Sequence, residues 1–74
     1  MNTREYNITI GQNLKELRIT NTEYNQQQIA RLLNYSNDMY RKIELGQTSL
    51  TTDKLIKLCT ILKCTPNNIL KGTY

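Results

Sequence analysis

The 74-residue sequence predicts an all-α fold, a compact five-helix bundle that forms one domain. Two observations support this prediction. Residues that cap helices recur along the chain, and each is followed by apolar residues at helical spacing. The connections between these segments are only a few residues long, as is usual in a small helical bundle.

The first helix is expected in "TIGQNLKELR", where Thr9 can serve as the N-terminal cap. Gly11, inside this segment, indicates either close packing or a frayed helix start. Residues 1–8 have no helical pattern. We expect this N-terminal extension to be flexible. The less favoured alternative is a strand that pairs two copies of the chain. The domain itself is expected to cover residues 9–72.

The later helices are marked by their ends. Asn25 is the expected cap of "NQQQIARLL", and Asn34 in the following turn suits a left-handed conformation. Ser36 is the expected cap of a third helix over Asn37 to Leu45, and Gly46 is its expected stop. A fourth helix is expected to start at Thr51 or Thr52. A fifth is expected after the cap Thr65, with Pro66 at its first position and Gly72 at its end.

Composition narrows the range of functions. Ten Lys and Arg against six Asp and Glu give a net charge of +4, which favours an anionic partner. A chain of this length buries only about 60% of the surface that its unfolded form exposes, so a deep catalytic cleft is not expected. The acids are scattered and the glycines isolated, so we predict that the protein is not an enzyme.

Neither a bound cofactor nor a membrane-spanning segment is expected. Histidine is absent, and Cys59 and Cys64 have no further ligand near them, so no metal site or other cofactor is predicted. Both cysteines lie in an apolar run and are expected as reduced core residues. No apolar run could span a membrane and no signal-peptide pattern follows Met1, so the expected location is the cytoplasm. No small-molecule ligand site is evident.

The segments "NQQQIARLL" and "SNDMYRKIELG" predict two short helices joined by a tight turn, the second of them basic on one face. Such a pair can place its second helix in the major groove of DNA. At helical spacing Tyr40, Ile43 and Glu44 share one side of that helix, and Asp38 and Lys42 point the other way. We expect the first side to pack and the second to be free for contact with a polyanion.

Several segments of the sequence resemble those of a known protein family. From Ile10 to Leu70 the sequence resembles the Xre/Cro family of helix-turn-helix DNA-binding domains, the class of phage repressors and many small bacterial regulators. The matching pieces are "IGQNLKELR", "QQQIARLL", "S...YRKIELG", "LIKLCTILKC" and "NNIL", which together extend over about four fifths of the chain. The resemblance implies a lambda-repressor-like fold and a DNA-binding function.

The resemblance also implies site residues. Asn37, Asp38 and Lys42 fall at the usual base-facing positions, where Lys42 would donate to guanine, Asn37 to adenine, and Asp38 would accept from cytosine N4. Gln26 falls where the family has a glutamine that contacts a phosphate and supports the reading helix; the alternative is a plain polar residue of the first turn. The other backbone contacts implied are those of Ser36, Tyr40, Arg41, Gln47 and Thr48.

Several further residues have expected roles. Arg18 and Glu44 coincide with a family pair that forms a structural ion pair between the first and third helices. The Tyr40 ring should pack inward with its hydroxyl at the rim, within reach of a phosphate. Leu45 stands at a position that is generally polar and should be exposed; a patch for a partner is the less favoured interpretation. Lys54, Lys57 or Lys15 could add phosphate contacts, although a solvated lysine is the commoner case.

Two functions of different classes follow. The favoured one is a sequence-specific transcriptional regulator, a repressor that binds a palindromic site on double-stranded DNA as a homodimer through the major groove, with half-sites roughly 34 Å apart. The alternative is a protein-interaction module on the same fold, such as an antitoxin-like or adaptor domain. Salt dependence separates the two, because neutralising several phosphates makes affinity fall steeply with salt.

Overall fold

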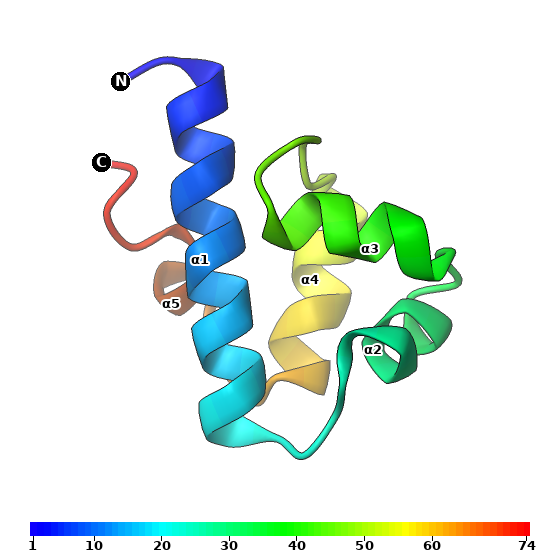
Figure 1. Ribbon diagram of the computed structural model, residues 1–74. Helices are drawn as coiled ribbons and strands as arrows, with labels where there is room; N and C mark the ends of the chain where they lie inside the picture. The colour runs from blue at the N-terminus through cyan, green and yellow to red at the C-terminus, as the bar shows by residue number, and fades with distance from the viewer.

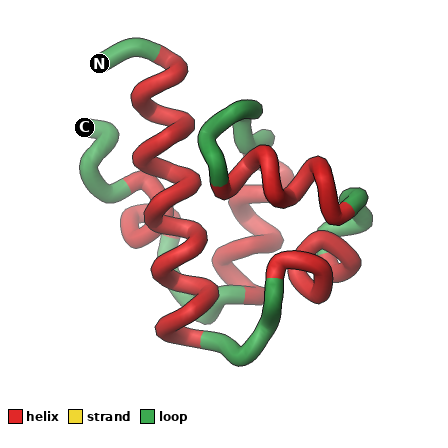
Figure 2. Tube along the Cα trace, in the orientation of Figure 1, coloured by secondary structure: helices red, strands yellow, loops and turns green.

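The computed structural model describes all residues, 1–74, and contains five helices and no strand (Figure 1, Figure 2). In chain order the helices are α1 (Thr3–Asn21), α2 (Gln26–Leu32), α3 (Asn37–Glu44), α4 (Thr52–Ile61) and α5 (Pro66–Leu70). The predicted all-α bundle of five helices is therefore confirmed.

The last four helices begin at the expected caps. In each of them a cap side chain accepts a hydrogen bond from the backbone N–H three residues further on, which satisfies a donor that has no partner within the helix. The caps are Asn25, Ser36, Thr51 and Thr65. In α2 the cap is reciprocal, because Gln28 accepts in turn from the backbone N–H of Asn25 at 2.8 Å.

The start of α1 differs from the prediction. The helix begins at Thr3 and its cap is Asn2, whose side chain accepts from the backbone N–H of Glu5 at 2.9 Å. The expected cap at Thr9 is wrong, and so is the flexible or strand-like interpretation of the N-terminal extension for the residues from Thr3 to Ile8. The β-branched run from Ile8 to Ile10 lowers local helix propensity, which is why the sequence pattern was misleading there.

Tertiary contacts hold this added part of α1. The backbone and side chain of Ile8 lie against Gly46, where an added Cβ would come within 2.6 Å of the Ile8 Cα. Asn7 Nδ2 also donates to Ser49 Oγ at 3.2 Å. The N-terminal part of α1 therefore packs on the segment that follows α3.

The turns use left-handed residues. Asn34 has φ of 59° between α2 and α3, as expected, and Gly46 has φ of 76° after α3. Lys63, after α4, also has a positive φ of 55°, which the sequence did not indicate because lysine rarely adopts this conformation.

The core is a single cluster between the helices. Helix α1 packs against α3 and α5, α2 packs against α3, and α4 packs against α5. Figure 1 shows α1 beside α5, with α2 and α3 together on the other side of the molecule. The buried apolar residues are Leu14, Ile29, Ala30, Leu33, Tyr40, Ile43, Leu58, Leu62 and Ile69.

Helix α1 also caps its neighbours. Asn13 Nδ2 donates to the carbonyl oxygens of Ile69 at 2.8 Å and Lys71 at 2.7 Å, and Asn21 Nδ2 donates to that of Leu62 at 2.9 Å. The last carbonyls of α4 and α5 would otherwise have no partner within their helices. These bonds fix α1 against the C-terminal half of the bundle.

The two cysteines are free thiols, partly buried against the core, as expected. Burial, and then the neighbouring Cys59, raises the pKa of Cys64 to about 11. Since the thiolate is the reactive form, Cys64 is a weak nucleophile at neutral pH. A structural role fits both residues.

Candidate nucleic-acid interface

Helices α2 and α3 form a helix-turn-helix unit in which α3 has two different faces. Tyr40, Ile43 and Glu44 are buried, with exposed fractions of 0%, 2% and 7%. Asn37, Asp38, Arg41 and Lys42 are all exposed. One face is fixed in the domain and the other is open to solvent, as the helical spacing predicts.

A shallow groove runs beside the exposed face of α3. Its lining brings residues of α3 together with residues of the following loop. The residues are Ser36, Asp38, Met39, Lys42, Gln47 and Thr48. Five of the predicted site residues thus share one surface, whereas Asn37, Arg41 and Gln26 are not part of this lining.

Met39 is a groove residue that the sequence did not single out. It is 40% exposed and stands between Asp38 and the buried Tyr40. Apolar contact with the thymine methyl group is one way in which a side chain reads a base edge. The signal available in the sequence was its place on the helix, next to the residues expected to face DNA.

The charges on this face are linked to one another. Asp38 Oδ1 lies 2.6 Å from Arg41 Nη2, and Asp38 Oδ2 lies 3.2 Å from Lys42 Nζ. The hydrogen bond from Arg41, and then that from Lys42, lowers the pKa of Asp38. The carboxylate is therefore ionised at neutral pH, and both cations of α3 are paired with it.

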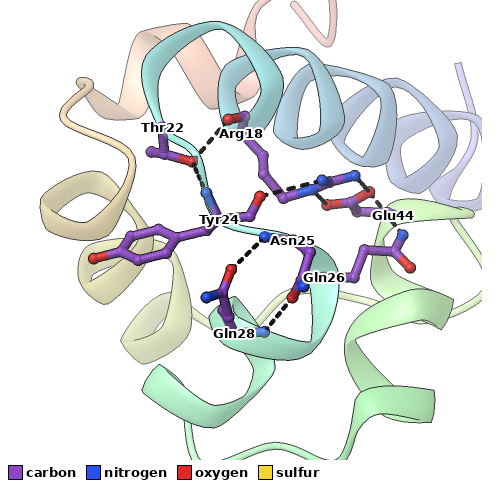
Figure 3. A network of polar contacts seen from close by, with 7 residues as sticks. All are labelled: Arg18, Thr22, Tyr24, Asn25, Gln26, Gln28 and Glu44. Carbon is purple, nitrogen blue, oxygen red and sulfur yellow. Dashed lines mark hydrogen bonds and ion pairs between the residues drawn. The ribbon is translucent and has the colours of Figure 1, made fainter.

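A buried polar network lies behind α3 (Figure 3). Arg18 in α1 donates from Nε to Glu44 Oε2 at 2.9 Å and from Nη2 to Glu44 Oε1 at 3.2 Å. This bidentate contact raises the pKa of Arg18. The side chain of Arg18 is 13% exposed and that of Glu44 2%, so the ion pair is largely shielded from water.

Gln26, the first residue of α2, joins the same network. Its Nε2 donates to Glu44 Oε1 at 2.9 Å, and Figure 3 shows its side chain reaching from the start of α2 toward Glu44. A glutamine amide has two N–H donors and one acceptor, so one donor and the carbonyl oxygen remain for another partner. Glu44 thus connects α1, α2 and α3.

The position of Tyr40 corrects one predicted contact. Its ring packs inward as expected, but the whole residue is 0% exposed, and the hydroxyl is buried without a hydrogen-bond partner. Burial, and then the nearby Glu44 carboxylate, raises the pKa of Tyr40. Because the hydroxyl lies inside the core and not at its rim, Tyr40 is not available to the DNA backbone.

Lys54 is also engaged within the protein. Its Nζ donates to the carbonyl oxygen of Leu33 at 2.7 Å and lies 4.8 Å from the centre of the Tyr35 ring. The side chain is only 15% exposed. Lys54 caps the end of α2 and holds the turn of the helix-turn-helix unit against α4, so it is not a free phosphate ligand.

No group of three or more His, Cys, Asp or Glu side chains is arranged to hold a metal ion. None of the helices has the length and apolar character that crossing a membrane requires.

Comparison with known proteins defines the class of this chain. A family model described as Helix-turn-helix matches residues 14–69, and the chain belongs to this family, in its Xre/Cro type. The family match indicates a DNA-binding transcription regulator. No curated protein sequence matches the chain.

A solved structure with the same fold is similar over almost its full length. The crystal structure of the restriction-modification controller protein C.AhdI from Aeromonas hydrophila has a TM-score of 0.81 to this chain and 25% sequence identity. The match covers 93% of this chain and 99% of that one. The arrangement of the five helices is therefore also found in a restriction-modification controller protein.

Proposed function

We propose that this chain is a sequence-specific DNA-binding regulator, a repressor that binds a palindromic operator as a homodimer through the major groove. The observation that carries the proposal is the two-faced α3, whose buried side is fixed while Asn37, Asp38 and Lys42 stand on the open side. A helix presented in this way can reach base edges without any change in the fold.

The contacts divide into two kinds. Lys42 donates to guanine O6 and N7, Asn37 pairs with adenine, and Asp38 accepts from cytosine N4. These three contacts select the sequence. The backbone contacts, which position the domain without reading bases, come from Gln26, Ser36, Arg41, Gln47 and Thr48.

Two polar groups suit backbone contact. Ser36 Oγ accepts from the Met39 backbone N–H at 3.1 Å, which leaves its hydroxyl hydrogen free to donate to a phosphate. Gln26 is held by Glu44 and keeps one free N–H at the start of α2, where the helix dipole favours an anion. Both side chains are therefore oriented before DNA arrives.

The similarity to C.AhdI supports a role in gene control. That protein is a restriction-modification controller, and it shares the whole fold with this chain. By analogy, we propose that this chain binds DNA in the control region of the genes that it regulates.

The test is selection of bound sequences from random DNA, followed by affinity measurements with variants. We expect an enriched palindrome. Lys42→Ala should lose the preference for that sequence, with a cost of about 1 to 3 kcal/mol on the selected site and little change on random DNA. Gln26→Ala should weaken binding to both kinds of DNA alike.

Matched controls keep these results interpretable. Lys57 forms the same type of ion pair on α4, with Asp53 Oδ2 at 3.5 Å, so Lys57→Ala should leave the sequence preference unchanged. Gln12 is an exposed glutamine on α1, and Gln12→Ala should leave affinity unchanged. Equal loss on selected and random DNA for Lys42→Ala would refute its role as a base reader.

A protein-interaction module is the second candidate, because one observation favours it. Leu45 is 51% exposed and lines a surface depression together with Ile8, which is 38% exposed. A partner chain could cover these apolar side chains. Absence of an enriched DNA sequence, with binding that varies little with salt, would favour this function over DNA recognition.

A further inference from the structure

Three charged side chains form an ion triad on the exposed face of α3. One carboxylate, that of Asp38, contacts both cations of the helix, with Oδ1 at 2.6 Å from Arg41 and Oδ2 at 3.2 Å from Lys42. Each carboxylate oxygen thus serves one cation. In the free protein, the two positive charges expected to meet DNA are both engaged.

The triad can open easily. The side chains of Asp38, Arg41 and Lys42 are 59%, 49% and 46% exposed. Ion pairs with this exposure contribute little to stability, so a DNA group that offers a better partner can replace them. Which DNA groups can do so depends on whether each member of the triad donates or accepts hydrogen bonds.

The two cations and the carboxylate need opposite partners. Phosphate oxygens accept hydrogen bonds, so they can take Arg41 and Lys42 but they repel Asp38. In the major groove only cytosine N4 and adenine N6 present donors to a carboxylate. A DNA site without such a donor at the right position releases the cations only by leaving Asp38 without a partner.

We propose that Asp38 is a specificity-determining residue that works by restraint: it keeps Arg41 and Lys42 from phosphates until a donating base edge takes its carboxylate. The inference rests on the proposed DNA-binding function and deepens it. Asp38 lowers affinity for DNA that lacks the matching base, and this penalty adds to any favourable contact with the correct one.

The experiment uses the full chain with Asp38→Asn, which removes the charge and keeps the shape of the side chain. Binding to the selected duplex and to random-sequence duplex is measured over a series of salt concentrations. Asp38→Asn should bind random DNA roughly threefold to tenfold more tightly than the natural chain. The ratio of selected to random affinity should fall.

The salt series gives a second readout. A cation released from Asp38 becomes available to one more phosphate, so the slope of log affinity against log salt on random DNA should steepen by about 0.9. Asp38→Ala, which also lacks the charge, should show the same change. A merely helix-stabilising role for Asp38 would move the thermal midpoint without moving this slope.

Glu16→Gln is the matched control for net charge. Glu16 is an exposed acid on α1, beside Asn68 and Lys71 of the α5 region. The substitution therefore removes the same unit of charge at a distance from the groove. We expect its affinity for random DNA to stay within twofold of the natural chain. This comparison separates the local effect of Asp38 from a general increase in positive charge.

The outcomes are distinct. If the natural chain binds DNA with strong salt dependence but Asp38→Asn behaves like Glu16→Gln on random DNA, the restraint by Asp38 is refuted and DNA binding stands. If the natural chain neither enriches a sequence nor shows salt-dependent binding, the proposed function itself fails. Tighter binding to random DNA together with a steeper slope for both Asp38 variants supports the inference.

Discussion

At the scale of single residues, the buried hydroxyl of Tyr40 lowers the free energy of unfolding. Its hydroxyl is buried without a hydrogen-bond partner, and an unsatisfied buried polar group costs about 1 to 3 kcal/mol. The ring, by contrast, is among the largest fully buried side chains of the core. The ring therefore contributes to the core through its burial, whereas the buried hydroxyl is a cost.

Tyr40→Phe should leave the protein at least as stable as before, because it removes only the unsatisfied group. The thermal midpoint should stay the same or rise, and affinity for DNA should not change. Calorimetry and a DNA titration measure the two quantities. A loss of DNA affinity with an unchanged midpoint would mean that the hydroxyl leaves the core to contact the DNA backbone.

At the scale of elements, the junction of α1 with α3 holds the reading helix in place. An added Cβ at Gly11 would lie 2.4 Å from the carbonyl oxygen of Glu44, so the two helices meet backbone to backbone. The Arg18 to Glu44 ion pair lies at the same junction, and Gln26 brings α2 into it. The orientation of α3 therefore depends on α1, far from it in the sequence.

Arg18→Met should destabilise the protein by about 3 kcal/mol, because Glu44 would keep its buried charge and lose its main partner. Unfolding by urea measures the change. The double variant Arg18→Met with Glu44→Leu should recover much of this loss, since no unpaired charge remains. Lys15→Met, at an exposed position of α1, is the control, and a similar small effect for Arg18→Met would contradict a stabilising role of the pair.

At the scale of the whole molecule, size limits what one copy can bind. The longest extent of the chain is 31 Å, and α3 has 8 residues. At about 1.5 Å per residue such a helix reads only a few base pairs, and half-sites of a palindrome lie roughly 34 Å apart. One copy can thus occupy one half-site, which is why we propose a homodimer.

Sedimentation with a palindromic duplex should give two chains for each duplex. A duplex cut to one half-site should bind at least about a hundredfold more weakly, because linking two binding modules adds affinity without new contacts. A single chain on the palindrome, with equal affinity for the half-site, would refute the homodimer. Pairing of two copies through residues 1–8 stays a prediction, and the same experiment with chains truncated there tests it.

The four later helices could be predicted from the sequence, since caps such as Ser36 and Thr65 act on neighbours within a few residues. The left-handed turn at Asn34 could be predicted too, whereas the one at Lys63 could not. Helical spacing also separated the buried from the exposed side of α3. Only the tertiary structure shows that the Tyr40 hydroxyl is buried, that Lys54 caps α2 and that the N-terminal part of α1 packs on the segment after α3. Each depends on groups distant in the chain, and local patterns carry no information about which distant groups will meet.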